Sequence, residues 1–106
     1  MENQSGFIYN VTIQVLEEIH AEWLNWLKEE HVPDVLNTGC FQKATILRVL
    51  DLQDAEGPTY AIQYLAENPM QYDRYIENHA TEMRSKSFDK WGNRFIAFRT
   101  IMEVIQ

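Results

Sequence analysis

FIYNVTIQVLEEIHAEWLNWLKEEHVP, residues 7–33, decides the fold because its hydrophobic period changes part of the way along. Over Phe7–Leu16 apolar and polar residues alternate and β-branched and aromatic side chains are frequent, which predicts a strand. From Leu16 onward the apolar residues recur every three or four positions, which predicts an amphipathic helix. Pro33 should end this helix, because the residue before a proline avoids helical backbone angles.

The rest of the chain repeats this alternation of strands and helices. Strands are expected at Ala44–Leu52, Thr59–Ala66 and Arg94–Ile105, and the turn QDAEGP, residues 53–58, joins the first two into a hairpin. A second helix should begin with Asn68 as its N-cap and Pro69 in its first turn. Its apolar stripe is Tyr72, Ile76, His79 and Met83, with Phe88 and Trp91 in the following connection and a turn at Gly92.

The resulting order, β-α-β-β-α-β, predicts an α+β, ferredoxin-like fold. Its four-stranded antiparallel sheet has the spatial order 4-1-3-2, with both helices on one face. Residues 7–106 should form this single domain, and residues 1–6 a disordered polar tail.

Each strand has a more apolar side and a mixed side, and the more apolar sides should face the helices. These sides are Phe7, Tyr9, Val11, Ile13, Leu47, Val49, Tyr60, Ile62, Tyr64, Ile96, Phe98 and Met102. The mixed sides are Asn10, Thr12, Gln14, Ile46, Arg48, Leu50, Ala61, Gln63, Leu65, Ala97, Arg99 and Ile101. A bare face with this many apolar residues usually meets a partner, so we expect a homodimer that packs through the open sheet face.

Composition restricts the partners and the compartment. The chain has 106 residues and a net charge of -7, without a Lys/Arg cluster, so neither nucleic acid nor an anionic membrane is an expected partner. Cys40 is the only cysteine, which is typical of a reducing compartment. No signal peptide and no apolar run of about 20 residues is apparent, so a cytoplasmic location is expected.

Five stretches together resemble domain-of-unknown-function family 4286: IYNVT (8–12), EWLNWLKEEHVPDVLNTGCF (22–41), LRVL (47–50), TYAIQY (59–64) and FIAFRT (95–100). That family comprises small bacterial proteins of the dimeric α+β barrel superfamily. The resemblance implies a ferredoxin-like protomer and a sheet-to-sheet dimer, and it implies no activity. In fold the superfamily is similar to cofactor-free monooxygenases, small isomerases and haem-degrading enzymes, but fold does not determine function.

The polar residues of the mixed face form the first candidate site. Arg48, Gln63 and Arg99 lie on neighbouring strands, and two arginines could hold a carboxylate or phosphate. The alternative, which we favour, is that they bond structural partners across the dimer, which could be Asn10, Gln14, Asp51 or Glu103.

The histidines form a second group of candidates. His20, His31 and His79 lie on or beside the helix stripes, and antiparallel helices should bring His20 and His79 to similar heights. Two histidines make a weak metal site, so we favour structural roles and predict no metal and no cofactor. Asn10 and His79 match the elements that carry the functional pair of the haem-degrading relatives, but the expected faces place them on opposite sides of the sheet.

The remaining conspicuous residues favour structural interpretations. Trp23 and Trp26 share one helix face and are expected in the core. Cys40 follows Gly39 in a loop without a nearby base, so we expect a structural thiol.

The favoured function is therefore a non-catalytic small-molecule-binding or interaction module. Its ligand-binding candidates are Arg48, Gln63, Arg99, Asn10, His31 and His79. The alternative is a cofactor-independent oxygenase-like or isomerase-like enzyme with a pocket between helices and sheet. That alternative requires a cavity beside His31, His79, Tyr9 or Trp23.

Overall fold

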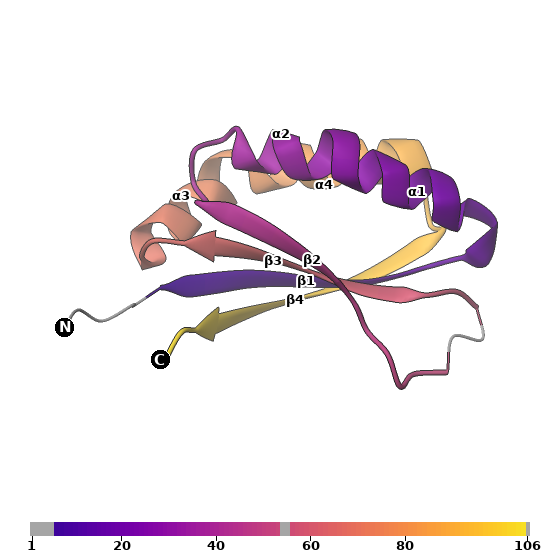
Figure 1. Ribbon diagram of the computed structural model, residues 1–106. Coiled ribbons are helices and arrows are strands. Elements are labelled where there is room, and N and C mark those ends of the chain that lie inside the picture. Colours follow the sequence, from indigo (N-terminus) through magenta and orange to yellow (C-terminus); the bar gives the residue numbers. More distant parts are fainter. Residues whose placement is uncertain (1–5, 54–55, 106) are drawn as a thin grey trace.

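The computed structural model describes residues 6–53 and 56–105, and it shows one sheet with all helices on one face (Figure 1). The strands are β1 (Phe7–Val15), β2 (Lys43–Arg48), β3 (Thr59–Ala66) and β4 (Phe95–Glu103), paired antiparallel in the order β2-β3-β1-β4. This is the predicted order counted from the other edge, and the ferredoxin-like fold is confirmed. Residues 1–5 of the predicted tail, residues 54 and 55 of the predicted turn, and residue 106 lie outside the described residues.

Each of the two predicted helices is a chain of shorter segments. The first comprises η1 (Glu17–Ile19), α1 (His20–Trp26), the π-helical turn η2 (Leu27–His31) and α2 (Val32–Leu36). The second comprises α3 (Pro69–Asn78) and α4 (Ala80–Trp91). No helix in the described part of the chain is long and apolar enough to cross a membrane.

Pro33 does not end the first helix, contrary to the prediction. Within a regular α-helix its ring would clash with the carbonyl four residues earlier. The π-helical turn avoids this conflict, because the Val32 N–H donates to the Leu27 carbonyl five residues back. Pro33 then stands in the first turn of α2, where its missing N–H costs little.

The second helix begins as predicted and ends later than predicted. The Asn68 side chain accepts a hydrogen bond from the Gln71 N–H at 3.0 Å, which confirms the N-cap. The helix breaks at His79 (φ -131°, ψ -28°) and then continues to Trp91, so Phe88 and Trp91 are helical rather than part of a connection. Gly92, with φ of 63°, makes the expected turn into β4.

The central strands present the predicted sides to the helices, as the burial of Tyr9, Val11, Ile62 and Tyr64 shows. The prediction is wrong for both outer strands. The inward side chains of β2 and β4 are Ala44, Ile46, Arg48, Phe95, Ala97 and Arg99, and the outward ones include Leu47, Ile96, Phe98 and Met102.

Pairing register is the physical reason for this correction. Directly opposite residues of antiparallel strands share a face. Arg99 pairs with buried Val11 and Arg48 pairs with buried Tyr60, so both arginines lie on the helix side. Strand β2 also ends at Arg48 instead of continuing to Leu52.

The core lies between the sheet and the helices. Trp23 and Trp26 are both buried, and the ring centroid of Trp23 lies 5.6 Å from that of Tyr60, which confirms their core role. Cys40 is also buried, with its Sγ 4.0 Å from the Thr38 carbonyl oxygen.

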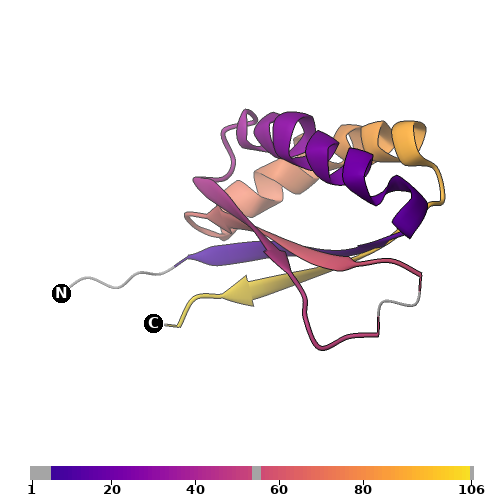
Figure 2. The same cartoon turned by 45° about the vertical axis from the view of Figure 1, so that its right-hand side comes forward.

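The opposite face of the sheet carries no helix of the described residues, and residues 49–53, which follow β2, extend to that side (Figure 2). The end of the β2–β3 connection binds the end of β1, because the Val15 N–H donates to the Pro58 carbonyl at 3.1 Å. Gly57, which directly precedes Pro58, has a φ of 155°, and a Cβ added there would lie 1.7 Å from the Val15 carbonyl oxygen. Only glycine permits this close approach of two backbone segments.

Candidate functional site

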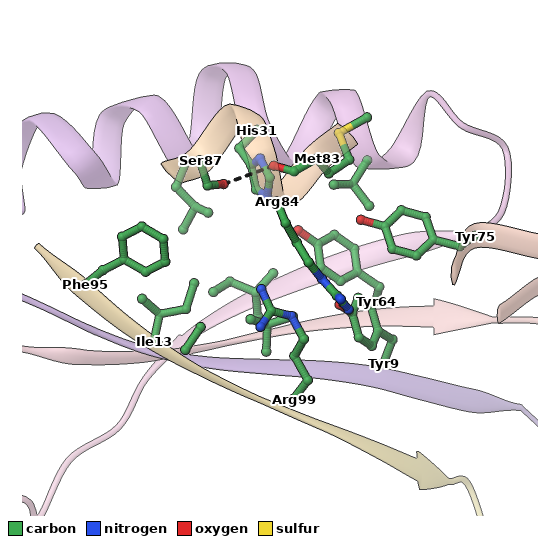
Figure 3. Close-up of a pocket in the computed structure, with 15 residues that line it drawn as sticks. Tyr9, Ile13, His31, Tyr64, Tyr75, Met83, Arg84, Ser87, Phe95 and Arg99 are labelled. Carbon is green, nitrogen blue, oxygen red and sulfur yellow. Dashed lines mark hydrogen bonds between the residues drawn. The ribbon is translucent and has the colours of Figure 1, made fainter. Parts of the chain in front are cut away.

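A cavity of about 50 Å³ lies between the helices and the inner face of the sheet (Figure 3). Apolar side chains from β1, β3, β4, the first helix and α4 form most of its walls, among them Val11, Leu27, Ile62 and Met83. A cavity of this size holds a few water molecules or one small chemical group.

Three tyrosine side chains line one end of the cavity. The ring centroid of Tyr9 lies 5.9 Å from that of Tyr64 and 5.6 Å from that of Tyr75. Burial raises the pKa of Tyr64 and of Tyr75, and the neighbouring tyrosines raise each pKa further. Both hydroxyls therefore stay protonated at neutral pH and can donate hydrogen bonds.

His31 lines the cavity from the last position of the π-helical turn. Its ring is stacked on that of Trp26, with the centroids 4.8 Å apart. Burial lowers the pKa of His31 from 6.5 to about 4; Asp34 opposes this, and Lys86 and Arg99 add to it. The imidazole is therefore neutral at pH 7, with one nitrogen free of a proton.

Two arginines reach the cavity from different elements. Figure 3 shows Arg84 entering from α4 and Arg99 from β4. Arg84 Nη2 donates to the Tyr9 hydroxyl at 3.4 Å. Across residues 6–53 and 56–105, neither guanidinium has a carboxylate within 4.0 Å, and no Asp or Glu lines the cavity.

The structure brings only two of the predicted ligand-binding candidates, His31 and Arg99, to this cavity. Asn10 and Gln63 lie opposite one another on the open face of the sheet. Arg48 lies at the other edge of the sheet, with its guanidinium carbon 5.8 Å from the ring centroid of Tyr60. The predicted convergence of Arg48, Gln63 and Arg99 on one face is therefore wrong.

The histidines of the two helices do not come together. His20 Nε2 is 2.6 Å from the Tyr60 hydroxyl, whereas the ring of His79 is stacked on that of Tyr75 at 6.3 Å. Tyr75 packs on Tyr9, whereas Tyr60 pairs with Ile13, which lies four residues further along β1. The prediction that His20 and His79 lie at similar heights is therefore wrong. The described residues contain no group of three or more His, Cys, Asp or Glu that could hold a metal ion.

Four polar residues of the cavity were not among the sequence candidates: Tyr64, Tyr75, Arg84 and Ser87. The type of aromatic residue at inward positions could have identified the tyrosines among these four. The chain has five tyrosines, and none of them is in the exposed class. Tyrosine in place of phenylalanine at several buried positions indicates that hydroxyl groups are needed there.

A second, more polar groove of about 420 Å³ lies outside the cavity, and His31 also lines it. Two of its charged residues pair with each other, because Lys86 Nζ lies 3.6 Å from Asp34, and Lys86 also lies 3.8 Å from Glu82. This groove is open to solvent and lacks the apolar walls of the inner cavity, so the inner cavity is the better candidate site.

Sheet order, helix placement and the cavity between them define a ferredoxin-like α+β protein with a helix–sheet pocket. The chain belongs to the family described as Domain of unknown function (DUF4286), whose model matches residues 6–105. This confirms the resemblance seen in the sequence. Among curated proteins no match was found.

Solved structures with the same fold share little sequence with this chain. A dimeric ferredoxin-like protein from an uncultured marine organism has a TM-score of 0.67 and 12% identity, with 96% of this chain and 97% of that chain covered. A protein of the ethyl tert-butyl ether degradation (EthD) family from Bacillus halodurans has a TM-score of 0.69 and 7% identity, with 93% and 99% covered. SnoaB, a cofactor-independent oxygenase from Streptomyces nogalater, has a TM-score of 0.67 and 12% identity, with 94% of each chain covered.

Proposed function

We propose that this protein is a cytoplasmic homodimer that binds a small molecule, without chemical change, in the pocket between its helices and its sheet. The observation that carries the binding function is the cavity itself. Apolar walls with a few convergent polar groups are the usual composition of a ligand site. Here His31, Arg84 and Arg99 provide those polar groups.

The homodimer is supported by the open face of the sheet, which is more apolar than the sequence suggested. Phe98 is 68% exposed and Ile96 is 56% exposed, and both belong to β4. Leu47 on β2 is 41% exposed on the same face. Exposed apolar residues gathered on one face mark an interaction surface.

A polar row across the middle of this face favours a second copy of the chain as the partner. Thr100, Asn10, Gln63 and Thr45 lie opposite one another on the four strands. Asn10 is only 7% exposed, and its Oδ1 has no hydrogen-bond partner among the described residues. A two-fold dimer would bring the same row of amides and hydroxyls against it and provide the missing donor. The dimeric ferredoxin-like neighbour supports the same arrangement.

The dimer is tested with two matched substitutions. Phe98→Glu brings a carboxylate into the proposed interface and should weaken the dimer by at least about tenfold. Phe88→Glu changes an equally large, 61% exposed side chain on α4 and should leave the dimer intact. Sedimentation equilibrium measures both, and an unchanged dimer in Phe98→Glu removes the open face from the proposal.

The binding function is tested by closing the cavity. Ala97 lines it from β4, and Ala97→Leu should fill the space without adding charge. A screen of small aromatic and aliphatic compounds by thermal shift should find compounds that stabilise the wild type and do not stabilise Ala97→Leu. Circular dichroism confirms that the variant is folded. If no compound stabilises the wild type, the binding function is refuted.

One observation favours a second candidate function, a cofactor-independent oxygenase-like or isomerase-like enzyme. The cavity lies beside His31 and Tyr9, as this alternative requires, and the neutral imidazole of His31 could act as a general base. A structural neighbour is itself described as a cofactor-independent oxygenase. Mass spectrometry and proton NMR of a bound compound recovered after incubation in air distinguish the two functions. A changed mass or a changed NMR spectrum that His31→Gln abolishes supports the enzyme, and an unchanged compound supports the binding protein.

A further inference from the structure

We infer that the pocket is selective for small organic carboxylates with an apolar body, and that Arg84 and Arg99 hold the carboxylate. This inference rests on the proposed binding function and adds the chemical class of the ligand.

The charge of the pocket is opposite to that of the protein. The chain has 16 Asp and Glu residues against 9 Lys and Arg, and yet the charged residues that line the cavity are two arginines and no acid. Carboxylates do pair with cations elsewhere in the molecule, as Asp34 does with Lys86 at 3.6 Å. Arg84 and Arg99 are both exposed residues, so an anion from solution can reach both guanidiniums.

The geometry favours one anion between the two arginines. Arg84 descends from the helix layer and Arg99 rises from the edge strand, so their side chains approach the cavity from opposite sides (Figure 3). Guanidinium groups bind a carboxylate with two parallel hydrogen bonds, which makes arginine a better partner for this planar anion than lysine.

The neighbouring polar groups are also suited to an anion. The Tyr75 hydroxyl stays protonated and can donate a hydrogen bond, because burial and the nearby Tyr9 raise its pKa. A cationic ligand would meet two positive charges here and no negative one.

The walls and the volume define the rest of the ligand. Ile13, Ile62 and Phe95 offer only apolar surface, so the body of the ligand should be apolar as well. A cavity of about 50 Å³ is too small for a nucleotide, a haem or an aromatic ring and matches a ligand of a few carbon atoms.

The test compares three small ligands of similar size and different charge: propionate, propionamide and propylamine. Isothermal titration calorimetry of the full chain at pH 7 and low salt should show that propionate binds at least about tenfold more tightly than propionamide, with no binding of propylamine. Arg84→Gln and Arg99→Gln should each weaken propionate binding about tenfold or more and leave propionamide binding within about twofold. Lys28→Gln, which removes the same charge from an exposed position of the first helix, is the matched control and should leave all three affinities unchanged.

The possible outcomes separate the two claims. If propionamide binds as well as propionate, or if the arginine variants keep the wild-type affinity for propionate, the carboxylate inference is wrong and the binding function stands. If Lys28→Gln weakens propionate binding as much as the arginine variants do, net charge and not the pocket explains the binding, which also overturns the inference. If none of the three compounds binds the wild type, while the wider screen of neutral compounds succeeds, the inference fails alone. If that screen fails too, both fail together.

Discussion

His31 should make the stability of this protein depend on pH in a way that a single substitution removes. The fold holds His31 in its neutral form, because burial lowers its pKa from 6.5 to about 4. Between these values the unfolded chain binds a proton that the folded chain does not, so stability rises with pH. The stabilisation that comes from keeping His31 neutral is fully present above pH 6.5, decreases as the pH falls, and is absent below about pH 4.

The size of the effect follows from the two pKa values. The thermodynamic linkage between protonation and folding gives a loss in the free energy of unfolding of about 2 kcal/mol between pH 7 and pH 5. The loss over the whole titration is about 3 kcal/mol. Charged groups around the ring come from three elements and partly cancel: Asp34 on α2 favours protonation, while Lys86 on α4 and Arg99 on β4 oppose it. Burial remains the largest contribution, so the direction of the effect does not depend on those charges.

Urea denaturation at pH 7, 6 and 5 measures the effect. His31→Gln should lose about 2 kcal/mol less than the wild type over this range, because glutamine does not titrate. Carboxylates titrate equally in both proteins, so the difference isolates His31. Equal pH dependence in the wild type and His31→Gln would refute the assignment of a neutral, buried imidazole.

Two further predictions concern stability. Trp23→Ala should lower the free energy of unfolding by about 3–5 kcal/mol in urea denaturation, because Trp23 is 1% exposed and its loss leaves a large cavity; a change below about 1 kcal/mol would place Trp23 outside the core. Gly57→Ala should cost at least about 2 kcal/mol, seen as a lower Tm, because the new Cβ would meet the Val15 carbonyl. Gly39→Ala is its control: Gly39 also has a positive φ, of 80°, but its nearest neighbour is 3.7 Å away, so it should cost clearly less, and equal losses would contradict the steric argument.

Much of the fold could be predicted because local signals and the global fold agree in the centre of the molecule. Strands β1 and β3 each have one clearly more apolar side, so their inward residues were identified correctly. The outer strands could not be assigned in the same way. In β4, Phe95 and Ala97 face the core while Ile96 and Phe98 are exposed, so both sides of this strand are apolar. Because the open face of the sheet also carries apolar residues, the more apolar side of a strand no longer identifies the side that faces the helices.

The candidate site was predicted in part for a related reason. His31 and Arg99 were named as candidates, but Arg99 was assigned to the wrong face with the rest of its strand. Arg84 was missed because the prediction followed the apolar stripe, which identified buried Met83 but not its charged neighbour Arg84. The break at His79 was missed as well, since no proline or glycine marks it.

The π-helical turn at Leu27–His31 is the place where the first helix accommodates one more residue than a regular α-helix would. An extra residue in a regular helix rotates everything after it by about 100° and would turn Val32 and Val35 away from the core. The wide turn absorbs one residue, so both valines stay buried. A chain that lacked one residue of this turn could keep the same inward side chains with ordinary α-helical bonding, but Pro33 would then stand inside a continuous helix. A deletion of one residue within Leu27–His31 should therefore be tolerated only if Pro33 is replaced as well.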